Sequence, residues 1–405
     1  MTQPAIPRDV VPGSPNHPAW LGVGSLALGT LALVTSEFLP ASLLSRMGQD
    51  LDVSQGLAGQ TVTATALMGA IVAPTISIVT RRLDRRFVIW GLTTLLVVSN
   101  GLVCATTNFW VTLLARLLLG IALAGFWSMA AATASRLVPP QTVAKAMSLI
   151  LAGVSVATVC ATPAGAFIGE ILGWRVAFAL AGILGTVALI AQMAWLPKLP
   201  ATAPASVSTL IHVSRRSRVR LGLIAVVFTA AGHFAGFTFV RPFLEQVPHM
   251  SAWLLSVSLL AFGLAGLAGN LVGGFGVDRS LRLTVAAAPL ILGIATISLA
   301  FFGSGLLVSI AMVTIWGFAF GGVPIGLQTW MARAAPDHLE SVGGLFIATF
   351  QIAIAIGSIA GGLLTDRVGV QGAVAVGGAV ALTAGVLILS LGGYDEDQGE
   401  MNAGS

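Results

Sequence analysis

Residues 110–136, WVTLLARLLLGIALAGFWSMAAATASR, form an apolar run that holds one charged side chain, Arg116, between its two ends. A helix that crosses a lipid bilayer needs about 20 predominantly apolar residues. Eleven more runs of this kind are spread along the chain, so the sequence predicts an all-α integral membrane protein with twelve transmembrane helices. The predicted spans are 20–44, 56–80, 87–106, 110–136, 146–172, 176–196, 221–244, 252–277, 283–303, 306–332, 341–365 and 370–393.

The composition excludes several other classes of protein. Of the 405 residues, 56% are hydrophobic and only 9% are charged, whereas about a quarter of the residues of a soluble domain are charged. A soluble enzyme, a nucleic-acid-binding protein and a disordered chain are therefore poor interpretations, and no nucleic-acid partner is expected. Cys104 and Cys160 lie inside apolar runs without metal-ligand spacing, so we expect both to be small core residues and expect no metal.

The distribution of basic residues predicts the orientation. Fifteen Lys and Arg residues lie in the connections on the side of the N-terminus, and only four, Arg46, Arg175, Arg241 and Arg367, lie on the other side. Cytoplasmic loops carry the excess of positive charge. We therefore expect both termini in the cytoplasm.

One connection is long enough to divide the chain. Residues 197–220 are rich in Pro, Ala and Ser and then basic, and we expect a cytoplasmic linker there. It separates an N-terminal six-helix bundle, 20–196, from a C-terminal six-helix bundle, 221–393. Residues 1–19 and 394–405, the second of them acidic, are predicted to be disordered cytoplasmic tails.

The two halves also repeat each other. Gly120, Arg136 and Pro139 recur 197 positions later as Gly317, Arg333 and Pro336. Ala164, Gly165, Glu170 and Gly173 recur 196 positions later as Ala360, Gly361, Asp366 and Gly369. Two repeated halves around a site at the midplane are typical of secondary transporters, so we expect two pseudo-symmetric bundles.

Three segments carry a family resemblance: LLARLLLGIALAGFW (113–127), GVSVATVCATPAGAFIGEILGWR (153–175) and TSEFLPASLL (35–44). They resemble motifs of the major facilitator superfamily, in its group of twelve-span drug/proton antiporters, and the whole chain is most similar to the bacterial purine ribonucleoside efflux pumps. The resemblance implies the major facilitator fold in a bacterial inner (cytoplasmic) membrane. It also implies a monomer that exports purine ribonucleosides such as inosine and guanosine by alternating access, with the proton gradient as energy source and no cofactor. A multidrug or sugar/proton antiporter of the same fold is the alternative.

The loop between the second and third spans departs from the family. It reads VTRRLDRRFVI (79–89), without the usual Gly and first Asp, and Asp84 falls where a second Gly is usual. We expect Arg81, Asp84, Arg85 and Arg86 to form a charge cluster that stabilises one state of the transport cycle, which leaves open whether Asp84 replaces the missing acid. Orientation by the positive-inside rule alone is the simpler interpretation.

Glu37 and Arg116 are the candidates for proton coupling. Ionisable groups inside a bilayer are costly and therefore functional candidates. Glu37 lies about seven residues before the outer end of the first span and Arg116 about six residues after the start of the fourth, so at 1.5 Å per residue both are roughly 10 Å deep. We expect Glu37 to bind the proton with Arg116 as its charge partner. A permanent ion pair that orders the two helices is the alternative.

Polar and aromatic side chains within the spans are the candidates for substrate binding. Trp127 follows Arg116 by eleven residues and so shares its helix face. His233 lies near the midplane, one helical turn before Phe237, and amides and indole rings can read a planar solute. The predicted substrate-binding residues are Arg116, Trp127, His233, Phe237, Trp316, Gln328 and Gln351. Ordinary core packing and interhelical hydrogen bonds are the competing interpretations of each.

Gating residues are expected at small side chains and helix ends. Gly153, Pro163, Gly165 and Gly169 of the fifth span allow close backbone approach, so we expect this span and the eleventh to slide against partners from the other half. Ion pairs at an outer gate are a further hypothesis, with interfacial snorkelling as the alternative. They would use Glu170, Asp366, Arg175, Arg241 and Arg367.

Other mechanisms lack their sequence signals. No phosphate-binding GxxxxGK[ST] loop is present, so ATP is not expected to drive the protein. No metal-binding or paired-carboxylate set suits an intramembrane enzyme, and no ring of like residues suits a channel. The prediction is a transporter that is not an enzyme.

Overall fold

The computed structural model describes residues 19–200 and 207–391, and within these ranges every regular element is a helix. Twelve of the helices are long and apolar enough to cross a membrane, as the sequence predicts. The predicted tails lie outside the described residues, except for Ala19.

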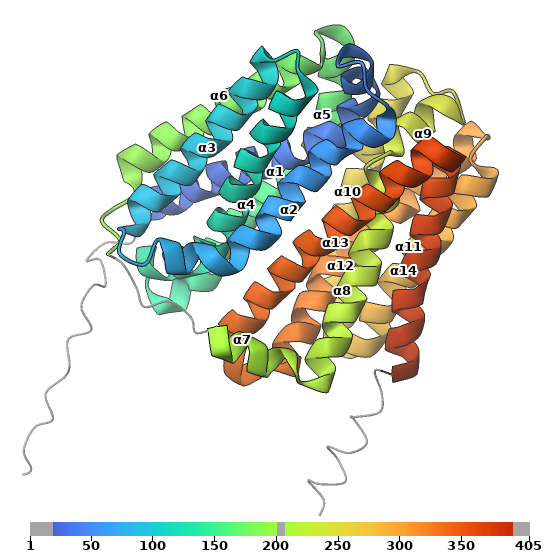
Figure 1. Ribbon diagram of the computed structural model, residues 1–405. Helices are drawn as coiled ribbons and strands as arrows, with labels where there is room; N and C mark the ends of the chain where they lie inside the picture. The colour runs from blue at the N-terminus through green and yellow to red at the C-terminus, as the bar shows by residue number, and fades with distance from the viewer. Residues whose placement is uncertain (1–18, 201–206, 392–405) are drawn as a thin grey trace, which may run out of the picture.

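Six long helices form the first half of the molecule (Figure 1). They are α1 Trp20–Asp50, α2 Gln55–Val79, α3 Arg85–Ala105, α4 Phe109–Leu137, α5 Val143–Ile171 and α6 Trp174–Trp195, with a 3-10 turn at Pro140–Thr142 between α4 and α5. The second half has six more, α8 Ser217–Phe237, α10 Ala252–Arg279, α11 Leu281–Phe302, α12 Leu306–Ala334, α13 Leu339–Val368 and α14 Val370–Leu391. Shorter elements complete it: α7 Val207–Ser214, α9 Val240–Gln246 and a 3-10 turn at Pro336–His338.

Local sequence determines where several of these helices begin and end. The side chains of Asp84, Asn108 and Ser251 each accept a hydrogen bond from a backbone N–H in the first turn of α3, α4 and α10, as N-cap residues do. Gly173 and Gly369 have φ of 90° and 86° at the turns into α6 and α14, a region that favours glycine. These two glycines are equivalent in the sequence repeat, so the two halves turn in the same way at the same place.

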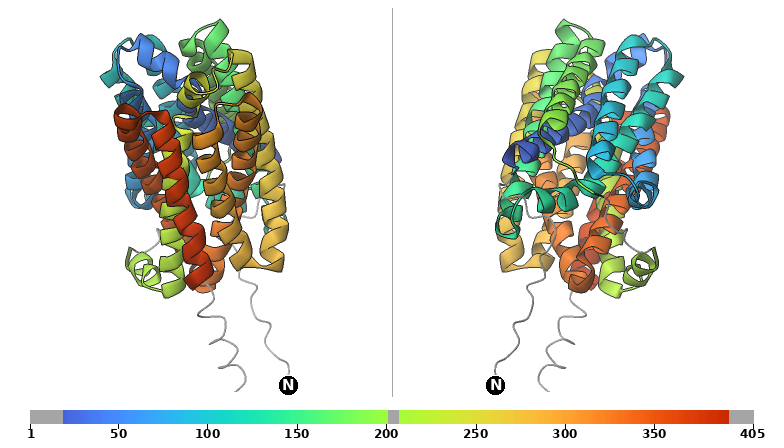
Figure 2. Two further views of the ribbon diagram at one scale, coloured as in Figure 1. Left: turned by 90° about the vertical axis from the view of Figure 1, so that its right-hand side faces the viewer. Right: turned by 90° about the vertical axis from the view of Figure 1, so that its left-hand side faces the viewer.

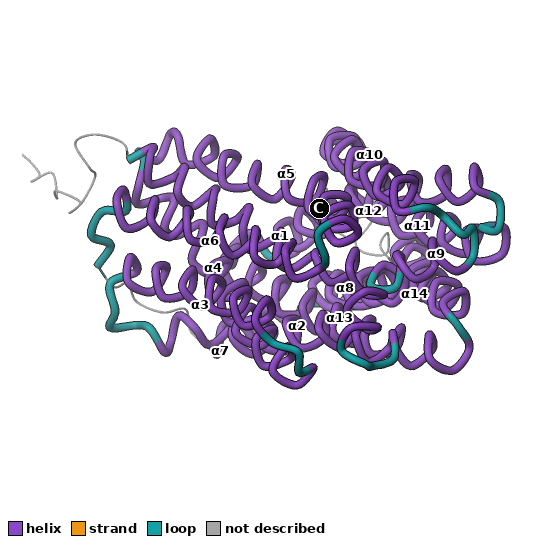
Figure 3. Tube along the Cα trace, turned by 90° about the horizontal axis from the view of Figure 1, so that it is seen from above, coloured by secondary structure: helices purple, strands orange, loops and turns teal. Residues whose placement is uncertain are grey.

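The first and second halves lie side by side, as the view from above shows (Figure 3). Contacts between them run mainly along α2 with α13 and α5 with α10. Because twelve spans separate the start of α1 from the end of α14, both lie at one end of the bundle, which we call the terminal face; α9 lies at the opposite face (Figures 1 and 2). The halves approach each other closely at the opposite face and splay apart toward the terminal face (Figure 1).

The seventh span differs from its predicted range of 221–244. α8 begins at Ser217 and ends at Phe237, and a separate helix, α9, begins at Val240. Pro242 has no N–H and its ring clashes with the carbonyl of residue i−4 in a continuous helix, which here is Thr238, at the break. Val240, Arg241, Pro242, Phe243 and Leu244 of α9 are buried, so α9 packs into the protein at the opposite face.

The connection predicted at 197–220 contains regular structure. Within its described part, α7 occupies Val207–Ser214 and α8 begins at Ser217. Leu199 is held to the first half, because its N–H donates to Asp84 and its carbonyl accepts from the Arg85 N–H. The beginning of this connection therefore packs on the N-terminal half.

Candidate functional site

A small cavity lies between the two halves near the middle of the bundle. Its space of about 10 Å³ is roughly that of one water molecule. Both halves supply its walls, from α1, α2, α8 and α13. The lining residues are Glu37, Phe38, Ala41, Val62, Thr65, Ala66, Phe234, Phe237, Thr238 and Ile354.

Glu37 is the only ionisable residue among those that line this cavity. The side chain is half-buried on α1, and it points into the interface between the halves rather than toward lipid. A carboxyl group inside a membrane span that reaches a cavity is a functional candidate, because burying it there is energetically costly. The structure therefore places the Glu37 carboxyl at the interface between the two halves.

Arg116 is close to Glu37 but is not bonded to it. Its side chain is fully buried on α4, and its Nη2 donates to the backbone carbonyl of Ser36 at 2.8 Å. Within the described residues no ion pair joins it to Glu37, although the charge of Arg116 acts on that carboxyl. Arg116 therefore does not form the predicted ion pair with Glu37 in this state, but bonds to the backbone of the preceding residue, Ser36. It also does not line the cavity.

The sequence of α1 explains why a guanidinium can bond to a helix carbonyl. In a regular helix the Ser36 carbonyl would accept from the N–H of residue 40, but residue 40 is a proline and has no N–H. Arg116 occupies the acceptor that Pro40 leaves free. The motif of Ser36, Glu37 and Pro40 thus fixes the cation beside the acid.

A polar cluster surrounds this contact. Asn100 Nδ2 donates to Ser36 Oγ at 2.8 Å, and Ser36 Oγ donates to the Ala32 carbonyl. Asn100 Oδ1 and the Nε and Nη1 of Arg116 are buried and have no hydrogen-bond partner among the described residues. Polar groups in that condition call for water or a ligand. Ser36 and Asn100 were not among the predicted site residues; for Ser36, the proline four residues later was the available signal.

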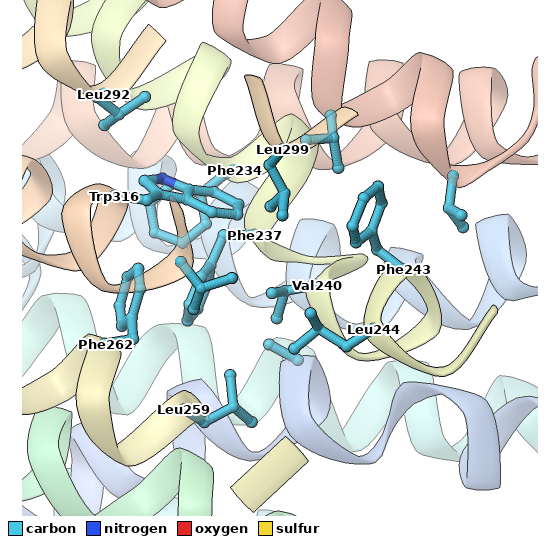
Figure 4. Close-up of a cluster of buried hydrophobic side chains, with 14 of the residues drawn as sticks. Phe234, Phe237, Val240, Phe243, Leu244, Leu259, Phe262, Leu292, Leu299 and Trp316 are labelled. Carbon is cyan, nitrogen blue, oxygen red and sulfur yellow. The ribbon is translucent and has the colours of Figure 1, made fainter. Parts of the chain in front are cut away.

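The structure brings together three predicted substrate-binding residues, His233, Phe237 and Trp316. Trp316 Nε1 donates to His233 Nδ1 at 3.0 Å, and Phe237 stacks on the imidazole with ring centroids 5.0 Å apart. Figure 4 shows Trp316, Phe237 and Phe262 gathered from three helices in one buried cluster. Of the three predicted residues, only Phe237 lines the cavity directly.

The other predicted substrate-binding residues lie apart. Trp127 is half-buried against the core of the first half, and Gln328 is exposed on α12. Gln351 is buried on α13 at the interface, where a Cβ added at Gly69 of α2 would lie 2.4 Å from its Nε2. The structure therefore does not gather these three side chains around the cavity.

Charged and polar side chains connect the halves at the opposite face. Arg241 of α9 is 1% exposed and donates to the Ser42 carbonyl at 2.6 Å and to Glu170 at 3.3 Å, both in the first half. Glu170 also pairs with Arg46 at 2.5 Å. Asp366 of α13 accepts from Ser54 Oγ at 2.7 Å and from the Gly56 N–H at 2.9 Å. Glu170 and Asp366, equivalent in the repeat, thus each bond to the other half.

Of the other outer arginines, Arg175 pairs with Asp50 within the first half, and the side chain of Arg367 is exposed. Of the residues predicted for an outer gate, Arg241, Glu170 and Asp366 are therefore the ones that bond to the other half.

The loop at 79–89 does not form the expected network of charges. Asp84 Oδ1 accepts from the N–H groups of Arg86 and Leu199, so it caps α3 and anchors the following connection. Arg85 bonds to Thr80, Arg86 stacks over the Phe87 and Trp90 rings, and Arg81 is exposed. The geometry of Asp84 therefore indicates a helix cap and not a substitute for the missing acid.

The glycines of α5 have a different neighbour from the one expected. A Cβ added at Gly153 would lie 2.5 Å from the Ala27 carbonyl oxygen, and one at Gly169 would lie 2.2 Å from a methyl of Leu43, both on α1. Gly165 also packs on α1. The expectation that this face slides against the other half is corrected: missing Cβ atoms let α5 pack tightly within its own half.

Contact of α5 with the other half uses another face. There, a Cβ added at Gly263 of α10 would lie 2.7 Å from Val159 Cα. Pro163 leaves the carbonyl of Val159 without its helical donor at this point.

Twelve spans in two repeated halves, with an acidic cavity between them, define a multi-pass membrane transporter of the alternating-access type. The family model of the Major Facilitator Superfamily matches residues 26–358. The chain belongs to this superfamily of transporters, and is not an enzyme.

Similar proteins agree with this assignment. The chain is 37% identical over 372 residues to the purine ribonucleoside efflux pump NepI of Escherichia coli (strain K12), covering 92% of this chain and 94% of the relative. The pump of the same name from Salmonella paratyphi C has the same identity and coverage.

Two solved structures share the fold. A bacterial homologue of the human lysosomal transporter Spinster has a TM-score of 0.72 at 17% identity, covering 93% of this chain and 96% of that one. The human organic anion transporter MFSD10 (TETRAN) has a TM-score of 0.65 at 19% identity, covering 91% of this chain and 98% of that one.

Proposed function

We propose that this protein is a proton-coupled antiporter that exports purine ribonucleosides such as inosine and guanosine from the bacterial cytoplasm. The observation that carries the proposal is Glu37, a carboxyl at the cavity between the halves with a buried guanidinium beside it. The nucleoside cargo rests on the relatives, which are purine ribonucleoside efflux pumps with 37% identity across nearly the whole chain.

The orientation of the protein in the membrane follows from the basic residues. The terminal face carries most of the arginines, so by the positive-inside rule it is cytoplasmic. The opposite face, where Arg241, Glu170 and Asp366 bind the halves together, is then the outer face. This state is inward-facing, closed outside, and the protein works as a monomer in the inner membrane.

Coupling needs Glu37 to change protonation state as the halves rock. Desolvation favours the neutral acid and a nearby cation favours the carboxylate, so opening the cavity to one side or the other shifts the balance. A proton would bind from outside and leave to the cytoplasm. Nucleoside would bind from the cytoplasm and leave to the outside.

The proton gradient supplies enough free energy without a cofactor. Moving one elementary charge across the membrane yields about 2.3 kcal/mol per 100 mV. Coupling one proton to one neutral nucleoside therefore supports a gradient of more than tenfold, because tenfold corresponds to about 1.4 kcal/mol.

The test uses inverted membrane vesicles, in which export appears as uptake. We expect the wild-type protein to accumulate labelled inosine or guanosine under an imposed proton gradient, and a protonophore to abolish the accumulation. Glu37→Gln should lose gradient-driven accumulation but keep exchange of labelled for unlabelled nucleoside, since the cavity is intact.

Asp278→Asn, which neutralises an exposed carboxyl on α10, is the control and should transport like wild type. Full gradient-driven accumulation by Glu37→Gln would contradict the proposal.

The second candidate, a multidrug or sugar exporter of the same fold, has one observation in its favour. Phe38, Phe234 and Phe237 line the cavity, and aromatic walls also suit apolar drugs. The same vesicles given labelled sugars and a fluorescent drug distinguish the two: drug accumulation without nucleoside uptake would support the second candidate.

A further inference from the structure

His233 lies in a column of aromatic rings in the C-terminal half. Phe320 stacks on one side with centroids 3.5 Å apart and planes at 6°, and Phe237 stacks at 5.0 Å and 19°. Phe262 lies beside this column, 5.0 Å from Phe237 and 6.3 Å from His233. With its faces covered, the fully buried imidazole has only its two ring nitrogens for polar contacts.

Trp316 determines which of these nitrogens carries the hydrogen. Its indole N–H donates to His233 Nδ1 at 3.0 Å, and indole can only donate. Nδ1 must therefore present a lone pair, and the neutral ring carries its hydrogen on Nε2. Across the described chain, that Nε2 has no hydrogen-bond partner. A buried donor left unpaired is costly and rare in folded proteins.

Two aromatic rings stand between the imidazole and the cavity. Phe234 packs edge-on against the imidazole at 4.8 Å, and Phe237 stacks on it. Both phenyl rings also line the cavity with Glu37. The Nε2–H lies in the plane of the imidazole, whose faces Phe320 and Phe237 cover, so a planar solute in the cavity would reach it by displacing Phe234, the ring that packs edge-on.

We propose that the His233 Nε2–H, with its tautomer held by Trp316, binds the base of the transported nucleoside and selects 6-oxopurines over 6-aminopurines. The proposal rests on the nucleoside function argued above. On the edge that includes N7, guanine offers two acceptors, N7 and O6, whereas adenine offers N7 beside an amino donor. Hypoxanthine has the same N7 and O6 acceptors as guanine. An Nε2–H directed at position 6 of the base therefore donates to O6 of a 6-oxopurine, whereas in adenine it meets a second donor, the amino group.

The experiment measures initial uptake of labelled guanosine, inosine and adenosine into inverted vesicles. Wild-type protein should favour guanosine and inosine over adenosine by about tenfold, the effect of one hydrogen bond gained or left unmade. Trp316→Phe frees Nδ1, so the imidazole can carry its hydrogen on either nitrogen and accept through Nε2. In this variant the ratio of guanosine or inosine uptake to adenosine uptake should approach one, while inosine uptake persists.

A second variant and a control separate this role from packing. His233→Phe keeps a flat ring without any donor and should also lose the preference. Trp330→Phe is the control, because it makes the same substitution on the same helix. The Trp330 indole donates to the Arg218 carbonyl and not to His233, so this variant should keep the preference for 6-oxopurines. In ¹⁵N spectra, the histidine signal that disappears in His233→Phe should show hydrogen on Nε2 in wild type.

Three results would overturn the inference and leave the transport function standing: nucleoside uptake with no 6-oxopurine preference, a preference unchanged in Trp316→Phe, or hydrogen on Nδ1. Absence of all nucleoside uptake in wild type would instead refute the proposed function, and the inference with it.

Discussion

Replacing Arg241 by methionine should open the outer face. The guanidinium is buried and makes two hydrogen bonds to the first half, to the Ser42 carbonyl and to Glu170. Methionine fills similar space without a buried charge, and Glu170 keeps Arg46 as its partner. The change therefore removes contacts between the halves. Within α9 it also removes the bond of 2.7 Å from Arg241 Nε to Glu245, a carboxylate that is 29% exposed.

The magnitude follows from those two bonds. A hydrogen bond that involves a charged group contributes about 1.5–3 kcal/mol, and the bond to Glu170 deserves the smaller value, because it is long and that carboxylate is 32% exposed. A total of about 3 kcal/mol corresponds to a shift of roughly 100-fold in the ratio of outward-open to inward-open molecules. A minor state of about 1% in the wild type would then become comparable to the major one.

The assay is a distance distribution between spin labels on cysteines introduced at Gln49 and Ser304, exposed positions of the two halves at the outer face. Cys104 and Cys160 are first replaced by serine. We expect one short-distance population in the wild type and a second, longer one in Arg241→Met.

Arg46→Met is the matched control, because it removes the other partner of Glu170 without touching a contact between the halves. Identical distributions in Arg241→Met and wild type, or an equal shift in Arg46→Met, would refute the reasoning.

Three more predictions test the local arguments. Pro40→Ala restores the N–H that competes with the guanidinium for a helix carbonyl, so proton-driven uptake in vesicles should fall about tenfold. Gly153→Ala forces a Cβ to 2.5 Å from a backbone oxygen and should destabilise the protein by about 1–3 kcal/mol in thermal unfolding. Gly101→Ala, with nothing within 4 Å, should stabilise it by about 0.5–1 kcal/mol. The Arg216 guanidinium holds the pKa of exposed Asp337 at about 2. Their ion pair therefore contributes fully above the ordinary value of 3.8 and is lost as pH falls through about 2. Asp337→Asn should accordingly lower the unfolding temperature by a small amount that is the same at every pH above about 5.

The spans and the repeat could be predicted because a bilayer imposes a simple rule on sequence. Apolar length alone identified twelve spans, and the offset of 196 residues predicted that Gly173 and Gly369 are equivalent. Both adopt a positive φ at the same turn of their halves. Equal depths in the first and fourth spans also placed Glu37 and Arg116 at the same level, and the structure brings them together.

The details of the contacts could not be predicted, since they depend on which helix faces meet. Span length does not say that Pro242 breaks its helix while Pro40 does not. α1 continues through Pro40, where a cation takes the freed carbonyl. α2, α5, α11 and α12 also continue through a proline, so a proline alone does not show where a helix ends. Small residues indicate close approach but not the partner, so the glycines of α5 were assigned to the wrong half. Asp84 looked like a charge partner, although the backbone N–H groups it bonds to lie 2 and 115 residues away.

The two halves contribute unlike chemistry to one cavity, and this difference explains how a proton can act on a solute. The first half holds the acid and its buried cation, whereas the second holds the aromatic column around His233. Phe38, next to Glu37, meets Phe237 edge-on across the interface at 5.9 Å. A change of charge or hydration at Glu37 therefore reaches the ring that covers the imidazole through one side chain. Under the proposed mechanism, proton and nucleoside need not touch each other to be coupled, because Phe38, Phe237 and Phe234 contact one another in series between Glu37 and His233.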